Sequence, residues 1–311
     1  MAEAFFLETE ACRDRITELF EFAWPTAAAL WNLRWQVRGF LNEVPDATKE
    51  QLDNRFLFGS DIPTADLKAT CIRKSWADQK QVFAGFILSS AVAAYEHWSE
   101  GIARELGVAA SESKKLQFED APEKQGVQSF VVAQTAVVSV TIEKEFYDSY
   151  VVKRKYAYPI IGNLMKCYRY YKEIRNSLMH GGGIANARAE QAYLDFLPVS
   201  DRTSLGMRGA LQIEPLSEGQ PVVIHLRGVV GFCDVLIRIL HSIDTELSRS
   251  KKAEASLKAR LSRRSAPQIL SADKNRRRSQ IAVRCQRAGL PRPRSTEFMY
   301  EFMRDNRLIG I

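Results

Sequence analysis

Residues 168–183 read YRYYKEIRNSLMHGGG, an aromatic and polar run that ends in a histidine and three glycines. Its apolar residues recur at helical spacing, and glycine is the residue that most often stops a helix at its C-terminal end. Pro159 and Gly162 lie just before this run. Proline is tolerated in the first turn of a helix and disfavoured in its interior, so the helix should begin near these two residues. The sequence therefore predicts a helix that opens near these residues and ends at His180.

The last turns of this predicted helix carry a permanent cation, an amide and a titratable imidazole, supplied by Arg175, Asn176 and His180. At roughly 100° per residue, Asn176 and His180 share one face, whereas Arg175 and His180 diverge by about 140°. A relaxed last turn, or a phosphate held between two copies of the helix, would reconcile the two directions.

The Arg-Asn-x-x-x-His pattern of Arg175, Asn176 and His180, in a late helix of an all-helical domain, resembles the HEPN family. HEPN domains are small helical bundles, many of which are metal-independent ribonucleases that act as toxins or phage-defence effectors. The resemblance covers roughly residues 81–250, and residues 165–184 look like the family's signature segment. It implies a homodimer in which two motifs face each other across one cleft, with no cofactor and no metal. An antitoxin or other regulator is then expected, because an unrestrained ribonuclease harms its host.

Cleavage of RNA without a metal needs a base for the ribose 2′-hydroxyl, an acid for the leaving 5′-oxygen and a cation for the phosphorane. Histidine titrates near neutral pH, so His180 is the expected acid or base. Arginine stays charged and offers a planar fork matched to phosphate, so Arg175 is the expected phosphate clamp. Asn176 would orient the imidazole or donate to a phosphate oxygen.

Supporting residues are expected nearby. Glu96 and His97, on a predicted long helix, would orient Arg175 or His180, and Tyr170 and Tyr171 would stack on a base.

Other interpretations than a nuclease stay open on the sequence alone. A histidine at a helix C-terminus is favoured by the helix dipole, and Arg175 could simply pair with Glu173 or Glu96. Some HEPN domains serve only as interaction modules, so the second hypothesis is a non-catalytic module that binds nucleic acid or a protein. A purely structural dimerisation protein is the third.

The rest of the chain predicts a mainly α protein with a bundle at its centre. Pro25 should start, kink or interrupt a helix within residues 4–42. The longest helical run is expected over residues 65–106, in one or two pieces, and alternation of apolar residues predicts strands rather than helices in three short segments. Three parts are expected: an N-terminal helical extension (1–62), a HEPN-like helical domain (63–250) and a basic C-terminal segment (251–311). Within the HEPN-like domain we expect a polar loop (108–126), a helix (130–150), a small antiparallel β insertion at about 190–227 and a helix (229–247). The strands of the insertion are expected at 191–197, 210–214 and 222–226.

Charge is distributed unevenly. The chain has a net charge of +7, but residues 251–311 hold 16 Lys/Arg and 5 Asp/Glu, a net of +11, which leaves −4 for residues 1–250. This asymmetry favours an anionic partner, most simply nucleic acid, although a basic tail can also serve solubility. The expected RNA-binding residues are Lys274, Arg276, Arg277 and Arg278. The aromatic residues 298–303 predict a short helix that docks on the body or on a partner.

Several classes of protein are disfavoured. The sequence has no apolar run long enough for a transmembrane helix, and its acidic N-terminus does not resemble a secretory signal. The five cysteines are scattered and form no C-x-x-C pair, so free, buried thiols in a cytoplasmic protein are expected rather than disulfides or a zinc site. His225 and His241 are interpreted as structural residues.

Overall fold

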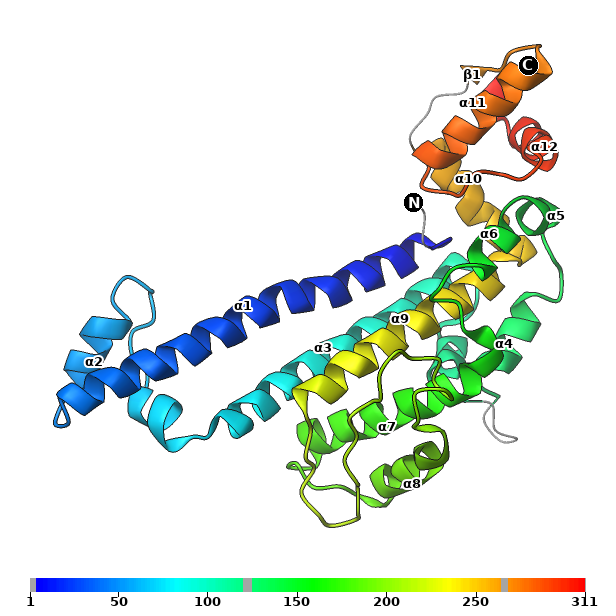
Figure 1. The fold of residues 1–311 in the computed structure, drawn as a ribbon. Coiled ribbons are helices and arrows are strands. Elements are labelled where there is room, and N and C mark those ends of the chain that lie inside the picture. The colour runs from blue at the N-terminus through cyan, green and yellow to red at the C-terminus, as the bar shows by residue number, and fades with distance from the viewer. Residues whose placement is uncertain (1–3, 120–124, 264–267, 311) are drawn as a thin grey trace.

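The computed structural model describes residues 4–119, 125–263 and 268–310, and within these ranges the protein is mainly helical, as predicted. Long helices α1 (Leu7–Glu43), α3 (Trp76–Glu105), α7 (Ile161–His180) and α9 (Leu226–Ser248) lie side by side (Figure 1). The shorter helices are α2 (Lys49–Phe56), α4 (Val127–Gln134), α5 (Val140–Ile142), α6 (Asp148–Val151), α8 (Ala187–Phe196), α10 (Glu254–Ser262), α11 (Lys274–Arg287) and α12 (Glu297–Asp305). Single 3-10 or π turns are η1 (Ala69–Arg73), η2 (Ala110–Gln117), η3 (Glu143–Tyr147), η4 (Tyr158–Ile160), η5 (Leu197–Val199) and η6 (Lys251–Ala253). Strands β1 (Gln268–Ile269) and β2 (Ile309–Gly310) pair in parallel.

The core of the bundle is built from aromatic side chains of α3, α7 and α9. Tyr168 of α7 lies between Tyr95 of α3, at 4.6 Å between ring centroids, and Phe232 of α9, at 6.4 Å. Tyr171 stacks on Phe232 at 4.5 Å. These rings are fully buried, and each such pair adds about 1 kcal/mol to the free energy gained by burial alone. The aromatic run of the opening motif is therefore what fixes α7 between its neighbours.

Helix α1 passes through Pro25 without interruption, so the predicted break is absent. Proline removes one hydrogen bond to the carbonyl four residues earlier. Both Pro25 and Glu21 are exposed, so water can satisfy that carbonyl. At 37 residues α1 is longer than α3, at 30, although the run over 65–106 was expected to be the longest. That run is in two pieces, η1 and α3, as the prediction allowed.

The first half of α1 belongs to the main core and the second half closes a smaller one. Cys12 and Ile16 are buried against the bundle, together with Phe5 and Phe6 just before the helix. Beyond the bundle, α1 packs against α2 and η1 around a separate apolar cluster of Val37, Leu52, Leu57, Leu67 and Cys71. As predicted for the cysteines, all five are free and buried.

The predicted β insertion at about 190–227 is wrong. Residues 187–196 form helix α8, which Asn186 caps, and its buried residues Ala189, Ala192 and Phe196 follow helical spacing. No strand forms over 197–225, a fully described range. Tyrosine hydroxyls replace a strand partner there: Tyr170 Oη donates to the Glu214 carbonyl at 2.7 Å and accepts from the Glu214 amide at 3.1 Å.

The single helix predicted over 130–150 is broken between α4 and α5. Residues 137–139 turn away to pair with the end of α9 and the residues that follow it. The Ser139 amide donates to the Arg249 carbonyl at 2.7 Å, and the Lys251 amide donates to the Val137 carbonyl at 2.8 Å. These bonds replace the helical hydrogen bonds that the break removes. They join residues too far apart in sequence for a local pattern to predict.

The basic C-terminal segment is folded onto the body. The fully buried carboxylate of Glu145 accepts hydrogen bonds from the amides of Ser295, Thr296 and Phe298, at 2.8–3.2 Å, where α12 begins. Met299 and Met303 of α12 are buried. The predicted short helix over residues 298–303 is thus confirmed, and it docks on the body.

Candidate functional site

Helix α7 ends at His180, as the three glycines predict. The amides of Gly181 and Gly183 both donate to the Ser177 carbonyl, at 3.0 and 2.9 Å. Gly182 and Gly183 have φ of 61° and 80°, a left-handed conformation that glycine adopts without strain. The glycines therefore turn the chain away directly after the imidazole and leave it at the surface.

His180 is exposed, and no hydrogen bond or ion pair joins its ring to another residue in the described part of the chain. Arg175 is half-buried, and its Nη1 donates to Asn176 Oδ1 at 3.1 Å. The Nε of Arg175 is buried without a hydrogen-bond partner among the described residues. Asn176 also donates to Glu173, at 3.3 Å, so it orients Arg175 and not His180.

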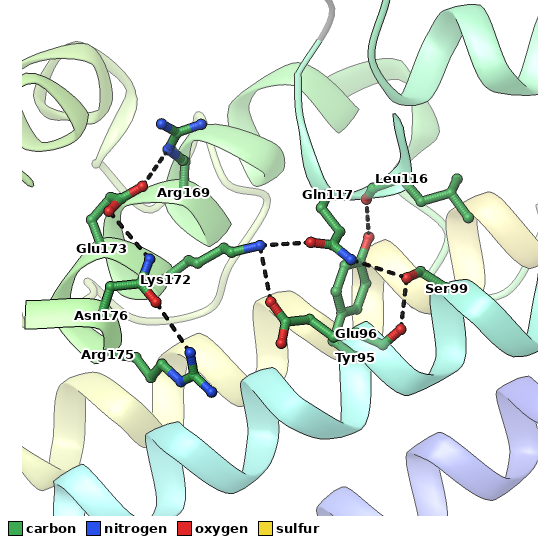
Figure 2. Close-up of polar contacts among 10 residues, drawn as sticks. All are labelled: Tyr95, Glu96, Ser99, Leu116, Gln117, Arg169, Lys172, Glu173, Arg175 and Asn176. Atoms are coloured by element: carbon green, nitrogen blue, oxygen red, sulfur yellow. Dashed lines mark hydrogen bonds and ion pairs between the residues drawn. The ribbon is translucent and has the colours of Figure 1, made fainter. Parts of the chain in front are cut away.

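Both carboxylates expected as alternative partners of Arg175 are paired with other cations (Figure 2). Glu173 forms an ion pair with Arg169 at 3.0 Å, and Glu96 forms one with Lys172 at 2.9 Å. No carboxylate in the described ranges pairs with Arg175. The guanidinium therefore keeps donor groups and a full charge that the fold does not use.

The second-tier residues lie apart from this pair. Glu96 faces α7, where Lys172 also bonds to Gln117 Oε1 at 2.6 Å. His97 is exposed and lies in a groove between α3 and α1. Within the described residues neither side chain bonds to Arg175 or His180, so the predicted orienting role finds no contact.

The predicted stacking role for Tyr170 and Tyr171 is not compatible with their burial. Both side chains are about 1% exposed. Tyr171 Oη donates to the Gln212 carbonyl at 3.2 Å, and burial raises the pKa of its phenol well above the usual value, so it stays a neutral donor. These tyrosines hold the 210–214 segment against α7.

The predicted RNA-binding residues occupy the first turns of α11. Arg276 is exposed and has no side-chain partner in the described ranges. The others are held loosely: Lys274 lies 3.7 Å from Glu297, Arg277 lies 4.8 Å from the centre of the Tyr300 ring, and Arg278 donates to the Ser295 carbonyl at 3.4 Å. Glu297 and Glu301 of α12 border this surface and reduce its net charge.

A second feature was not found by sequence reasoning. His225 Nε2 lies 2.7 Å from Glu214 Oε1, beside a cavity of about 650 Å³ where α3 and α9 begin. The sequence favours a structural role for His225 because this residue lies within an apparent strand. The contact with Glu214, which is eleven residues away, shows how His225 is held beside the cavity. No sequence pattern signals that contact.

No family model, curated protein or solved structure matches this chain. Among the described residues no group of three His, Cys, Asp or Glu side chains is arranged to hold a metal ion. No helix in the described ranges combines the length and the apolar character that a membrane span needs.

Proposed function

We propose that this protein is a metal-independent endoribonuclease of HEPN type, of the toxin or phage-defence class, with His180 as general acid or base and Arg175 as phosphate clamp. The observation that carries the proposal is that Arg175 has no carboxylate partner within the described chain, although Glu173 lies on the same helix and Glu96 on the neighbouring α3. A cation left unneutralised on the helix that ends in an exposed imidazole suits an anionic ligand.

Two copies of the chain complete the proposed site. On a regular helix the side chains of Arg175 and His180 diverge by about 140°, so one copy does not aim both groups at a single phosphate. A second α7 end, facing the first, supplies the missing group from the opposite side. The exposed end of α7 and the glycine turn after it leave room for this approach. A homodimer across α7 is therefore part of the proposal.

In this arrangement the imidazole of His180 takes the proton from the ribose 2′-hydroxyl or returns one to the leaving 5′-oxygen. Arg175 holds the non-bridging oxygens and stabilises the added negative charge of the phosphorane. Asn176 keeps the guanidinium in place through its 3.1 Å hydrogen bond. Such a nuclease needs restraint in its host, so a regulator protein belongs to the same proposal.

The test is incubation of the purified protein with total RNA in the presence of EDTA, read on a denaturing gel. We expect chelator-resistant cleavage that the His180→Ala variant loses. His97→Ala is the matched control, since it removes another exposed histidine that contacts neither Arg175 nor His180. Cleavage by His180→Ala at the wild-type rate, or none by the wild type, would refute the assignment.

A second candidate function, a nucleic-acid-binding module without catalysis, is supported by α11. Its exposed Arg276 is unpaired within the described residues, and Lys274, Arg277 and Arg278 surround it. Binding of RNA that depends on these four residues, with no cleavage, would favour this function over the first.

A further inference from the structure

A cavity of about 650 Å³ lies where α3 and α9 begin, separate from the α7 motif. Its walls come from Trp24 of α1, the first turns of α3, the segment 223–225 and the first residues of α9. Small-molecule and cofactor sites typically enclose about 300–1,000 Å³. The cavity is thus large enough for a nucleotide, and neither Arg175 nor His180 lines it.

Two cations on its wall are available to a ligand. Lys80 and Arg227 are exposed, and their side chains make no hydrogen bond or ion pair with any residue that the structure describes. The acidic residue on the wall, Asp78, is engaged, because its carboxylate accepts the Ser75 amide at 3.2 Å in the cap of α3. A phosphate would therefore meet two cations that have no partner.

An aromatic and apolar surface lies beside these cations. The Trp24 ring is 45% exposed, and Phe20 stacks on it at 5.6 Å between centroids with a 29° tilt, which holds it in place. Ile224 and Val230 add apolar area to the wall. Nucleic-acid bases of any sequence stack on exposed aromatic rings of this kind.

His225 adds a directional polar group. Its Nε2 lies 2.7 Å from the Glu214 carboxylate, which accepts the proton of that nitrogen. In the neutral ring Nδ1 is then a hydrogen-bond acceptor. A ribose hydroxyl is a donor of the matching kind.

From these contacts we propose that the cavity binds a nucleoside phosphate, with the base on Trp24, the phosphate on Lys80 and Arg227, and a ribose hydroxyl on His225. The ligand is either a free mononucleotide or one nucleotide of an RNA chain, because both present the same groups. The proposal does not depend on the ribonuclease activity, since the cavity and the α7 motif share no residue.

The test measures binding to the full chain by calorimetry, with the four ribonucleoside monophosphates and a short oligoribonucleotide as ligands. The His180→Ala background keeps the oligonucleotide intact. Trp24→Leu and the pair Lys80→Glu/Arg227→Glu should each weaken binding by about tenfold or more. Circular dichroism establishes that each variant is folded.

Matched controls are Trp35→Leu, an exposed tryptophan further along α1, and Arg154→Glu, an exposed arginine in the turn after α6. Both should bind as the parent protein does. Binding of monophosphates identifies a free nucleotide as the ligand, and binding of the oligonucleotide alone identifies a unit of RNA. No binding of either at millimolar concentration, or equal binding by the cavity variants and the controls, overturns the proposal.

Discussion

The helical bundle has two ends (Figure 1), and their polar side chains differ in burial and bonding. At the closed end, where α9 finishes, Glu145, Asp244 and Glu246 are buried and each accepts several hydrogen bonds. At the open end, where α7 finishes and α3 and α9 begin, His180, Arg227 and Lys80 are exposed, and their side chains make no hydrogen bond or ion pair within the described residues.

This difference separates polar groups that stabilise the fold from polar groups that are available to a ligand or substrate. Buried polar atoms are almost always satisfied, because leaving one unpaired costs about 1–3 kcal/mol. Exposed cations carry no such penalty, so they can be kept for a ligand. We therefore expect changes to the buried, bonded groups of the closed end to alter stability, and changes to exposed cations or to His180 to alter cleavage or binding.

The largest expected effect is on cleavage, at the open end. Arg175→Ala removes the proposed phosphate clamp, and loss of one such group typically lowers a rate by about 100–1,000-fold. Single-turnover cleavage of a defined RNA measures it. Lys166→Ala is the control, because it removes another cation of α7 and leaves the ion pairs of Glu96 and Glu173 intact.

A mixing experiment sharpens the same point. If the site combines groups from two copies, mixing Arg175→Ala with His180→Ala should restore cleavage that neither variant shows alone. A mixture that forms dimers and stays inactive would argue against the paired site.

The next effect is on stability, at the closed end. Glu145→Ala leaves the amides of Ser295, Thr296 and Phe298 without their acceptor, and we expect the free energy of unfolding to fall by about 3 kcal/mol. Urea denaturation measures this change. Glu297→Ala, an exposed residue at the start of α12, should change it by less than about 0.5 kcal/mol. Equal stability of the Glu145 variant and the wild type would show that the C-terminal segment is not anchored there.

A smaller effect is the dependence of stability on pH. Burial raises the pKa of Asp244 to about 7, although its carboxylate accepts the Phe5 and Phe6 amides at 2.6 and 2.9 Å. An unfolded aspartate titrates near pH 4, so between about pH 4 and 7 the native state binds more protons. Stability should then fall as pH rises through this window, and Asp244→Asn should flatten that slope. Thermal melting across the range tests it, with exposed Asp305→Asn expected to keep the wild-type slope.

The smallest effect concerns RNA affinity through α11, on the closed side. Replacing Arg276 and Arg277 by glutamine should lower the slope of log affinity against log salt by about 1–2, without changing the melting temperature by more than a few degrees. Filter binding at several salt concentrations gives the slope. An unchanged slope would remove α11 from the RNA-binding surface.

Local signals predicted those parts of the fold that depend on neighbouring residues. The end of α7 follows from three glycines, and α9 from its apolar spacing. Where distant residues decide, prediction failed. The segment 210–214 alternates like a strand, but it bonds to the hydroxyls of Tyr170 and Tyr171, over forty residues away.

The candidate site divides in the same way. The positions of Arg175 and His180 at the end of one helix could be predicted, because helical geometry is local. The choice of ion pairs could not be predicted, because it depends on how α3 packs against α7. Glu173 pairs with Arg169 and Glu96 with Lys172, which leaves Arg175 without a carboxylate among the described residues. The same reason hid the contact between His225 and Glu214.

The length of α3 sets the distance between the two candidate RNA-contacting surfaces of the proposed nuclease. The helix has 30 residues, so it is about 45 Å long, and it separates α11 on the closed side from the end of α7 (Figure 1). At about 3.4 Å for each stacked nucleotide, one strand needs about 13 nucleotides to cover that length. A stacked RNA strand that touches α11 and is cut beside His180 of the same chain must be about that long, so shorter stacked fragments reach only one of the two surfaces.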